Sequence, residues 1–286
     1  MDKNTEMKTD KILGIGVVGN FAGHLSQAGE AKDFAEIHTD TEAPKGIFPF
    51  YVPNDKQHPL GRYCINNDQI ILPSDPFLNV QAEPELALEC DLIYDSHHHI
   101  TEVIPKFFMA FNDASVRNDK NATKLSQKKN FSSGSKAHGI KIPLDNFSYG
   151  GICDSYSLVS FVGFNDQLEL YGKLSKLIDY SYFHEKLIDW LKDRLNHQKE
   201  MTTLEDFSEI LQMSHYPEKI LVAIGATCYT ELGETRFLQE KDEVFIVVFN
   251  HNKYSLNEVK EMLKNKTIPL QGNNDFSIVH QKVIRG

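Results

Sequence analysis

One stretch decides the fold of this sequence: VQAEPELALE, residues 80–89. Alternation along a β-strand would place Glu83 and Glu85 on one face and the apolar residues on the other. At roughly 3.3 Å per residue the two carboxylates would stand about 6.6 Å apart, close enough to converge on one hard cation. Pro84 cannot donate a hydrogen bond to a neighbouring strand, so we expect a sheet edge or a bulge here. The same pattern also fits a solvated polar face opposite a core face.

A second acidic position follows at the end of another apolar run. The segment FFMAFNDASVRN, residues 107–118, reads as a strand whose end carries Asp113 and Arg117. Ligands are often bound at such strand ends. The later segment 128–139 contains glycines, hydroxyls and Lys129, which suits a loop that closes on a ligand. The alternative for this segment is a flexible basic surface loop.

Histidines and glycines invite further interpretations. His24 lies just past the apolar run 12–18 and near Glu30, where a mobile segment could carry an acid–base group; a merely structural histidine is the alternative. The run of three histidines at 97–99 fits a surface loop, because adjacent residues cannot share a strand face. The glycines of 14–19 have dinucleotide-site spacing, but they fall inside an apolar run instead of opening a helix.

Composition excludes several classes of protein. The chain has 286 residues, 41% of them hydrophobic and 24% charged, as expected for a globular protein with a large core. It has 30 Lys and Arg against 40 Asp and Glu, hence a formal net charge of −10, and no basic block that would bind nucleic acid. A polar N-terminus and the lack of a bilayer-length apolar run predict a cytoplasmic protein without membrane contact. Four scattered cysteines fit reduced thiols.

Hydrophobic periodicity predicts a β-rich α+β fold. Apolar and aromatic runs predict strands at 12–18, 47–53, 69–73, 83–94, 156–161 and 244–249. Apolar residues at helical spacing predict helices at about 182–196, from about 203, and at 255–264. We expect a single catalytic domain over residues 1–286, with a polar N-terminal arm at 1–11 and a helical insertion at 180–215.

Taken in order, these motifs resemble the fumarylacetoacetate hydrolase superfamily. The shared segments are GNFAGH (19–24), IF (47–48), ILP (71–73), EPELA (83–87), NDASVR (112–117), KNF (129–131), ILVAIGAT (220–227) and FLQEKDEV (237–244). The resemblance covers about residues 14–249, and the collinear set is more specific than any one motif. It implies a rolled mixed sheet with a β-barrel-like core and peripheral helices.

The resemblance implies a metal site. The divalent-metal ligands of the superfamily fall on Glu83, Glu85 and Asp113, and all three residue types match. This agrees with the strand-face argument made above for the two glutamates. Oxygen ligation fits Mg²⁺ or Mn²⁺.

Substrate-binding and catalytic positions follow from the same resemblance. The active-site lysine falls on Lys129, although Lys128 stands where the superfamily has glycine, and the motif arginine falls on Arg117. The threonine that receives a substrate carboxylate falls on Thr227, although Ala226 replaces the preceding glycine.

The superfamily histidine falls on His24, but its usual partner is missing. Gln27 stands where many members carry the glutamate that activates this histidine. Glu30 is the nearest carboxylate, and it could substitute if the segment folds with an altered turn.

The activity implied by the resemblance is that of a Mg²⁺- or Mn²⁺-dependent hydrolase. It would break a C–C bond of a small acylpyruvate or related 2-oxo acid through a metal-stabilised enolate. A decarboxylase or a tautomerase or isomerase of 2-oxo acids stays open, as does a non-catalytic binding protein that kept the pocket, because Gln27 departs from the pattern. The resemblance also suggests a homodimer.

Overall fold

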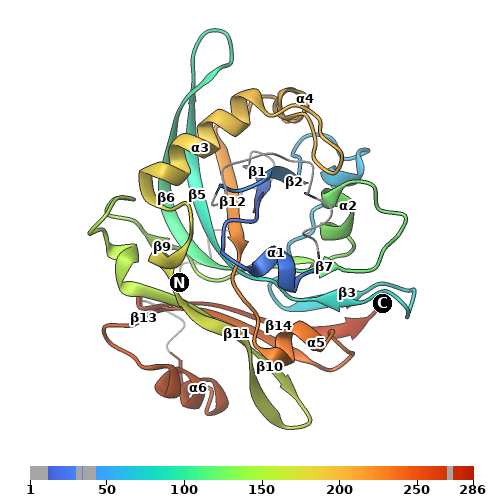
Figure 1. Cartoon of the computed structure of the whole chain (residues 1–286), viewed down its shortest axis with the longest axis vertical. Coiled ribbons are helices and arrows are strands. Elements are labelled where there is room, and N and C mark those ends of the chain that lie inside the picture. Colours follow the sequence, from blue (N-terminus) through green and yellow to red (C-terminus); the bar gives the residue numbers. More distant parts are fainter. Residues whose placement is uncertain (1–11, 30–33, 35–42, 269–272) are drawn as a thin grey trace, which may run out of the picture.

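The structure is a computed structural model that describes residues 12–29, 34, 43–268 and 273–286. The expected N-terminal arm at 1–11 and the candidate Glu30 lie outside these residues. Two sheets with few helices around them form the frame (Figure 1). This arrangement of mixed, curled sheets and peripheral helices confirms the predicted β-rich α+β class.

The first sheet carries residues 84–89 of the deciding stretch in an interior strand, β5. Its strands run in the order β2-β1-β12-β5-β6-β8, with β9 also paired to β6. Among the strand pairs that the structure describes in this sheet, β1–β12 is parallel and the others are antiparallel. The bounds are β1 Ile12–Val18, β2 Gly46–Tyr51, β5 Pro84–Tyr94, β6 Ile100–Asp113, β8 Lys136–His138, β9 Ile142–Pro143 and β12 Lys219–Ala226.

The second sheet packs against the first. Its order is β11-β10-β13-β14-β3, with β14 and β3 parallel. The bounds are β3 Gln69–Leu72, β10 Tyr156–Phe164, β11 Gln167–Lys176, β13 Glu243–Asn250 and β14 Phe276–Arg285, and a separate short pair joins β4 Val80–Gln81 to β7 Ser115–Val116.

The helices lie around the two sheets (Figure 1). They are α1 His24–Gln27, α2 Leu125–Lys129, α3 His184–His197, α4 Phe207–Met213, α5 Glu231–Thr235 and α6 Leu256–Lys264, with short 3-10 turns η2 Pro59–Gly61, η3 Ile152–Ser155 and η4 Leu177–Asp179. α3 buries Leu187, Leu191 and Leu195, a four-residue spacing that keeps one face on the core. α6 packs on the second sheet, at the lower end of Figure 1. Among the described residues, none of these helices has the length and apolar character needed to cross a bilayer.

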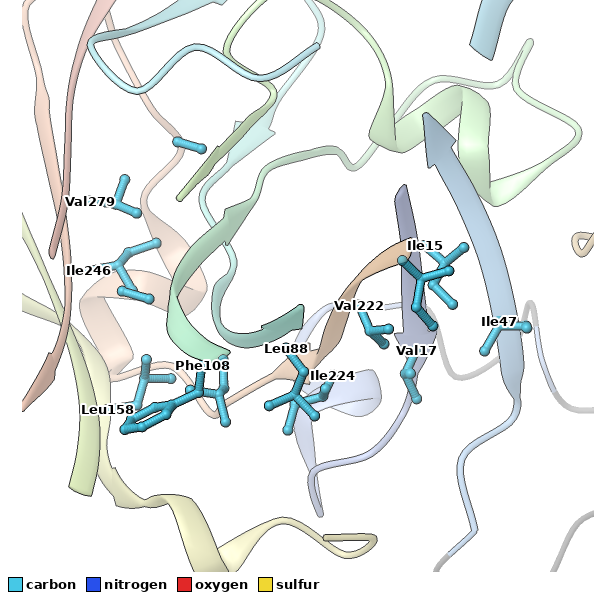
Figure 2. Packing of buried hydrophobic residues seen from close by; sticks show 14 of the residues in the cluster. Ile15, Val17, Ile47, Leu88, Phe108, Leu158, Val222, Ile224, Ile246 and Val279 are labelled. Atoms are coloured by element: carbon cyan, nitrogen blue, oxygen red, sulfur yellow. The ribbon is translucent and has the colours of Figure 1, made fainter. Parts of the chain in front are cut away.

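The largest buried cluster of apolar side chains contains residues of both sheets. Side chains from both sheets meet there, and Figure 2 shows Leu88 and Phe108 of the first sheet near Leu158 and Ile246 of the second. Ile15 and other β1 side chains extend the same cluster toward β2.

The glycines of β1 make room for aromatic rings. A Cβ on Gly14 would lie 2.2 Å from the ring of Phe50, and one on Gly16 would lie 2.3 Å from the ring of Phe48. Both rings come from the paired strand β2 and are buried. Packing therefore explains this glycine spacing, in agreement with rejecting a dinucleotide site.

Of the two positions expected for Pro84, a sheet edge or a bulge, the structure shows the second. β5 lies between β12 and β6, and the β5–β12 register shifts between Ala223 and Ala226, beside the start of β5. One helix start differs from the sequence prediction. The second helix begins at Phe207 and not near 203, because the Asp206 side chain accepts the Ser208 N–H at 2.8 Å and caps the helix there.

Candidate active site

The pairing of β5 with β6 brings the three predicted metal ligands together. Glu83 directly precedes β5, Glu85 is its second residue, and Asp113 ends β6. The Asp113 N–H donates to the Glu83 carbonyl at 3.1 Å. One oxygen of each of the three carboxylates lies within 4.8 Å of the others, and all three side chains are buried.

The Asn112 side chain makes hydrogen bonds that hold this strand end in place. Its Oδ1 accepts the Glu83 N–H at 3.1 Å, and its Nδ2 donates to Gln281 Oε1 at 2.7 Å. Gln281 lies on β14 of the second sheet, so one side chain links the acidic strand end to the opposite layer. Sequence reasoning quoted Asn112 within its motif but assigned it no contact.

Two of the predicted cationic residues contact the carboxylates directly. Lys129 Nζ lies 2.6 Å from Glu83 Oε2 and 2.7 Å from Asp113 Oδ2. Arg117 Nη2 lies 2.8 Å from Glu83 Oε1, and Arg117 Nε donates to Gln81 Oε1 at 2.7 Å. Glu83 thus faces two cations at once.

Lys136 is a third cation at the site, and sequence reasoning missed it. Its side chain is fully buried, and Nζ lies 2.9 Å from Asp113 Oδ1. Asp113 and Lys136 face each other in the β6–β8 register. Lys136 lies in the segment 128–139, but the sequence pattern assigned it no role, and the contact depends on the pairing of β6 with β8.

The electrostatic environments of the two glutamates are opposite. Burial alone would raise the pKa of Glu83, but Arg117 and Lys129 beside it hold that pKa well below its usual range. Burial and the neighbouring Asp113 raise the pKa of Glu85 well above its usual range, and Lys129 offsets this only in part. Glu85 Oε2 accepts the Gly225 N–H at 2.9 Å. Glu85 is therefore the carboxylate whose charge the protein compensates least.

His24 lies beside the carboxylates with one ring nitrogen unpaired. His24 Nδ1 is 2.9 Å from the carbonyl oxygen of Thr227. A carbonyl only accepts, so Nδ1 carries the proton and Nε2 of the neutral ring has a lone pair. His24 Nε2 is buried without a hydrogen-bond partner and lies 3.7 Å from Glu83 Oε2. Nε2 is therefore the ring nitrogen that lies toward the carboxylates.

The backbone, not a carboxylate, orients the His24 ring. Gln27 Oε1 accepts the Tyr229 N–H at 3.0 Å, and Gln27 Nε2 donates to the Tyr229 carbonyl at 3.3 Å. The Gln27 side chain is thus used to hold the Tyr229 backbone. Glu30, the predicted substitute, lies outside the described residues, so its role stays a prediction.

Thr227 is placed next to the acidic strand end. Its N–H donates to the Pro84 carbonyl at 3.1 Å, and its hydroxyl Oγ1 lies 3.4 Å from the same oxygen. The preceding Gly225 has a φ of +113°, a conformation that favours glycine, and this turn directs its N–H at Glu85. The predicted role of Thr227 toward a substrate carboxylate stays a prediction.

Tyr229 is a second residue that sequence reasoning missed. Its hydroxyl donates to the Ala82 carbonyl at 2.8 Å and accepts from Arg117 Nη2 at 3.0 Å. Its ring contacts that of His24, with centroids 5.3 Å apart. The buried phenol therefore positions both Arg117 and His24.

The donor set fits a hard divalent cation. All three candidate ligands are buried carboxylates that offer oxygen atoms close to one another, and Glu85 makes no ion pair among the described residues. Oxygen donors of this kind suit Mg²⁺ or Mn²⁺. The histidine run, by contrast, lies in an exposed turn between β5 and β6, at the far end of this hairpin.

Comparisons with known proteins give a family and a fold. Residues 30–283 match the model of a family described as a family of unknown function, DUF5718. No curated protein matched the sequence.

Three solved structures resemble the chain. A 5-carboxymethyl-2-hydroxymuconate delta-isomerase from Mycobacterium smegmatis is 18% identical, with a TM-score of 0.50 over 97% of this chain and 80% of that one. A 2-keto-3-deoxy-D-arabinonate dehydratase complexed with magnesium and 2,5-dioxopentanoate is 16% identical, with a TM-score of 0.52 over 97% and 74%. A protein assigned to the fumarylacetoacetate hydrolase family, from Yersinia pestis CO92, is 15% identical, with a TM-score of 0.50 over 96% and 94%. The fold is thus that of the fumarylacetoacetate hydrolase superfamily, as the sequence motifs predicted.

Proposed function

The chain belongs to DUF5718, a family of unknown function, and from this premise we propose that it is a divalent-metal-dependent enzyme acting on a small 2-oxo acid. The reaction that we propose is hydrolysis of a C–C bond in a substrate of the acylpyruvate type. The observation that carries this proposal is the meeting of Glu83, Glu85 and Asp113 beside the unpaired Nε2 of His24.

The metal-binding part of the proposal assigns the three carboxylates as ligands of Mg²⁺ or Mn²⁺. A cation held there would supply a Lewis acid and an anchor for the substrate's oxygens. The magnesium in the dehydratase structure of the same fold supports this choice of ion. Lys129 and Arg117 would place positive charge where negative charge develops on the substrate, and Thr227 would receive its carboxylate.

The catalytic part assigns His24 as the general base. Its Nε2 would take a proton from water, whose oxygen would add to the acyl carbon, while the Thr227 carbonyl keeps the ring oriented through Nδ1. The C–C bond would then break, its electron pair would stay on the pyruvate carbon, and the proton would return to that carbon. The products would be a carboxylic acid and pyruvate.

One observation favours a second reaction on the same site. The position of the usual activating glutamate is occupied by Gln27, which binds the Tyr229 backbone and not His24. A backbone carbonyl stabilises a protonated imidazole less than a carboxylate does. Decarboxylation or isomerisation of a 2-oxo acid, which needs no activated water, is therefore the alternative.

Turnover and metal binding, measured separately, test the proposal. We expect Mg²⁺ to bind the wild-type protein in calorimetry and a panel of acylpyruvates and 2-oxo acids to yield products identified by mass spectrometry. Glu85→Gln should lose both Mg²⁺ binding and turnover. The control is Glu102→Gln, which replaces an exposed glutamate on β6 and should lose neither. Mg²⁺ binding without turnover would refute the proposed reaction and indicate a non-catalytic binding protein. Unchanged Mg²⁺ binding in Glu85→Gln would refute the metal site.

A further inference from the structure

Lys136 contributes a buried positive charge that the proposed reaction does not use. Its side chain is fully buried, so its ammonium cannot reach a substrate. Besides Asp113, its Nζ contacts backbone carbonyls, those of Ala114 at 3.3 Å, Ser135 at 3.2 Å and Lys129. A buried ammonium is costly to the fold unless it is paired. Its partner here is a carboxylate of the candidate metal site.

Two of the three carboxylates are paired with cations before any metal is added. Glu83 contacts Arg117 and Lys129, whereas Glu85 makes no ion pair among the described residues. Asp113 has an ammonium at each oxygen: Lys136 near Oδ1 and Lys129 near Oδ2. The pairing of Asp113 therefore does not require a bound ion.

Lys136 differs from the other two cations in how it is held. Arg117 and Lys129 each contact Glu83, which stands next to His24. Lys136 is enclosed by carbonyl oxygens and by the β6–β8 pairing, so its charge stays where it is when a ligand enters. It is a fixed charge beside one metal ligand.

We propose that Lys136 is a built-in counter-charge that sets the affinity of the site for its divalent cation. It holds Asp113 and stabilises the metal-free protein, and by the same charge it repels the ion. This makes Lys136 a positioning residue, and the inference rests on the proposed function because it takes the three carboxylates as metal ligands. The expected consequence is a weak, readily reversible metal site.

The test measures Mg²⁺ and Mn²⁺ binding by calorimetry, and melting with and without Mg²⁺, in the wild type and in Lys136→Met. The variant should bind Mg²⁺ at least about tenfold more tightly, because a like charge a few ångströms from the ion is gone. Its metal-free form should melt earlier, and Mg²⁺ should raise its melting temperature by more than it raises that of the wild type. Lys219→Met, which removes an exposed lysine paired with Asp91, is the matched control and should behave as the wild type.

The outcomes separate the inference from the proposed function. If the wild type binds Mg²⁺ and Lys136→Met binds it equally or more weakly, the inference is wrong while the proposed metal site stands. If only the variant binds the ion, the inference holds and the wild-type enzyme does not use a metal. If neither binds, both are wrong. Should Lys136→Met not fold without metal, purification in Mg²⁺ and the neutral, polar Lys136→Gln give the same comparison.

Discussion

Glu83 should be the carboxylate on which the stability of the metal-free site depends most. Its two oxygens lie 2.6 Å from Lys129 Nζ and 2.8 Å from Arg117 Nη2, and all three side chains are buried. Glu83→Gln keeps the shape but leaves both cations short of an anion. Removing one partner of a buried ion pair lowers the free energy of unfolding by about 3–5 kcal/mol. We take about 3 kcal/mol, because Lys129 keeps Asp113 as a partner.

The expected shift is large enough to measure by thermal denaturation. At about 2 °C per kcal/mol for a chain of this size, Glu83→Gln should melt about 6 °C below the wild type in buffer with EDTA. Glu85 makes no ion pair among the described residues, so Glu85→Gln should cost much less. A Glu83→Gln variant that melts within about 1 °C of the wild type would refute the view that Glu83 holds the two cations.

Three further predictions concern catalysis, packing and pH. His24→Ala should lower kcat by about 10²–10⁴ and leave the Mg²⁺ dissociation constant within about twofold, and unchanged kcat would exclude His24 as the base. Gly16→Ala should destabilise the protein by about 1–3 kcal/mol in urea denaturation because its Cβ would meet the buried Phe48 ring, whereas Gly163→Ala has room; equal stabilities would contradict this. Burial raises the pKa of Glu205, so ionising it costs the folded state more as pH rises above 4.5. Glu205→Gln should therefore be more stable than the wild type at pH 7 but not at pH 4. The same difference in unfolding free energy at both pH values would refute a raised pKa for Glu205.

Local patterns predicted the parts of the fold that depend on local physics. The strands 12–18 and 83–94 and the helix at 182–196 were found within one or two residues, because periodicity reports burial directly. Pro84 was expected at a sheet edge or a bulge, and the structure shows the second: β5 is an interior strand, and the β5–β12 register shifts beside Pro84. A proline at the first residue of a strand removes only one hydrogen bond between strands. The register shift in β12 accommodates that loss inside the sheet.

The site required information that no single segment contains. Alternation places Glu83 and Glu85 on one face, but Asp113 joins them only through the β5–β6 pairing. The family resemblance supplied Asp113 as a third ligand without predicting that pairing. Lys136 and Tyr229 were missed because their contacts depend on the packing of β8 and of the chain after β12. The metal and substrate roles of the predicted residues stay predictions until binding is measured.

The bond between Asn112 and Gln281 has a consequence for biosynthesis. The ribosome makes β5 and β6 early, but the glutamine that braces their acidic end belongs to β14 and emerges more than 160 residues later. Until then, the nascent chain carries three clustered anions without their final support. If the three carboxylates bind a metal as proposed, its capture should be a late event, after the C-terminal strand has docked.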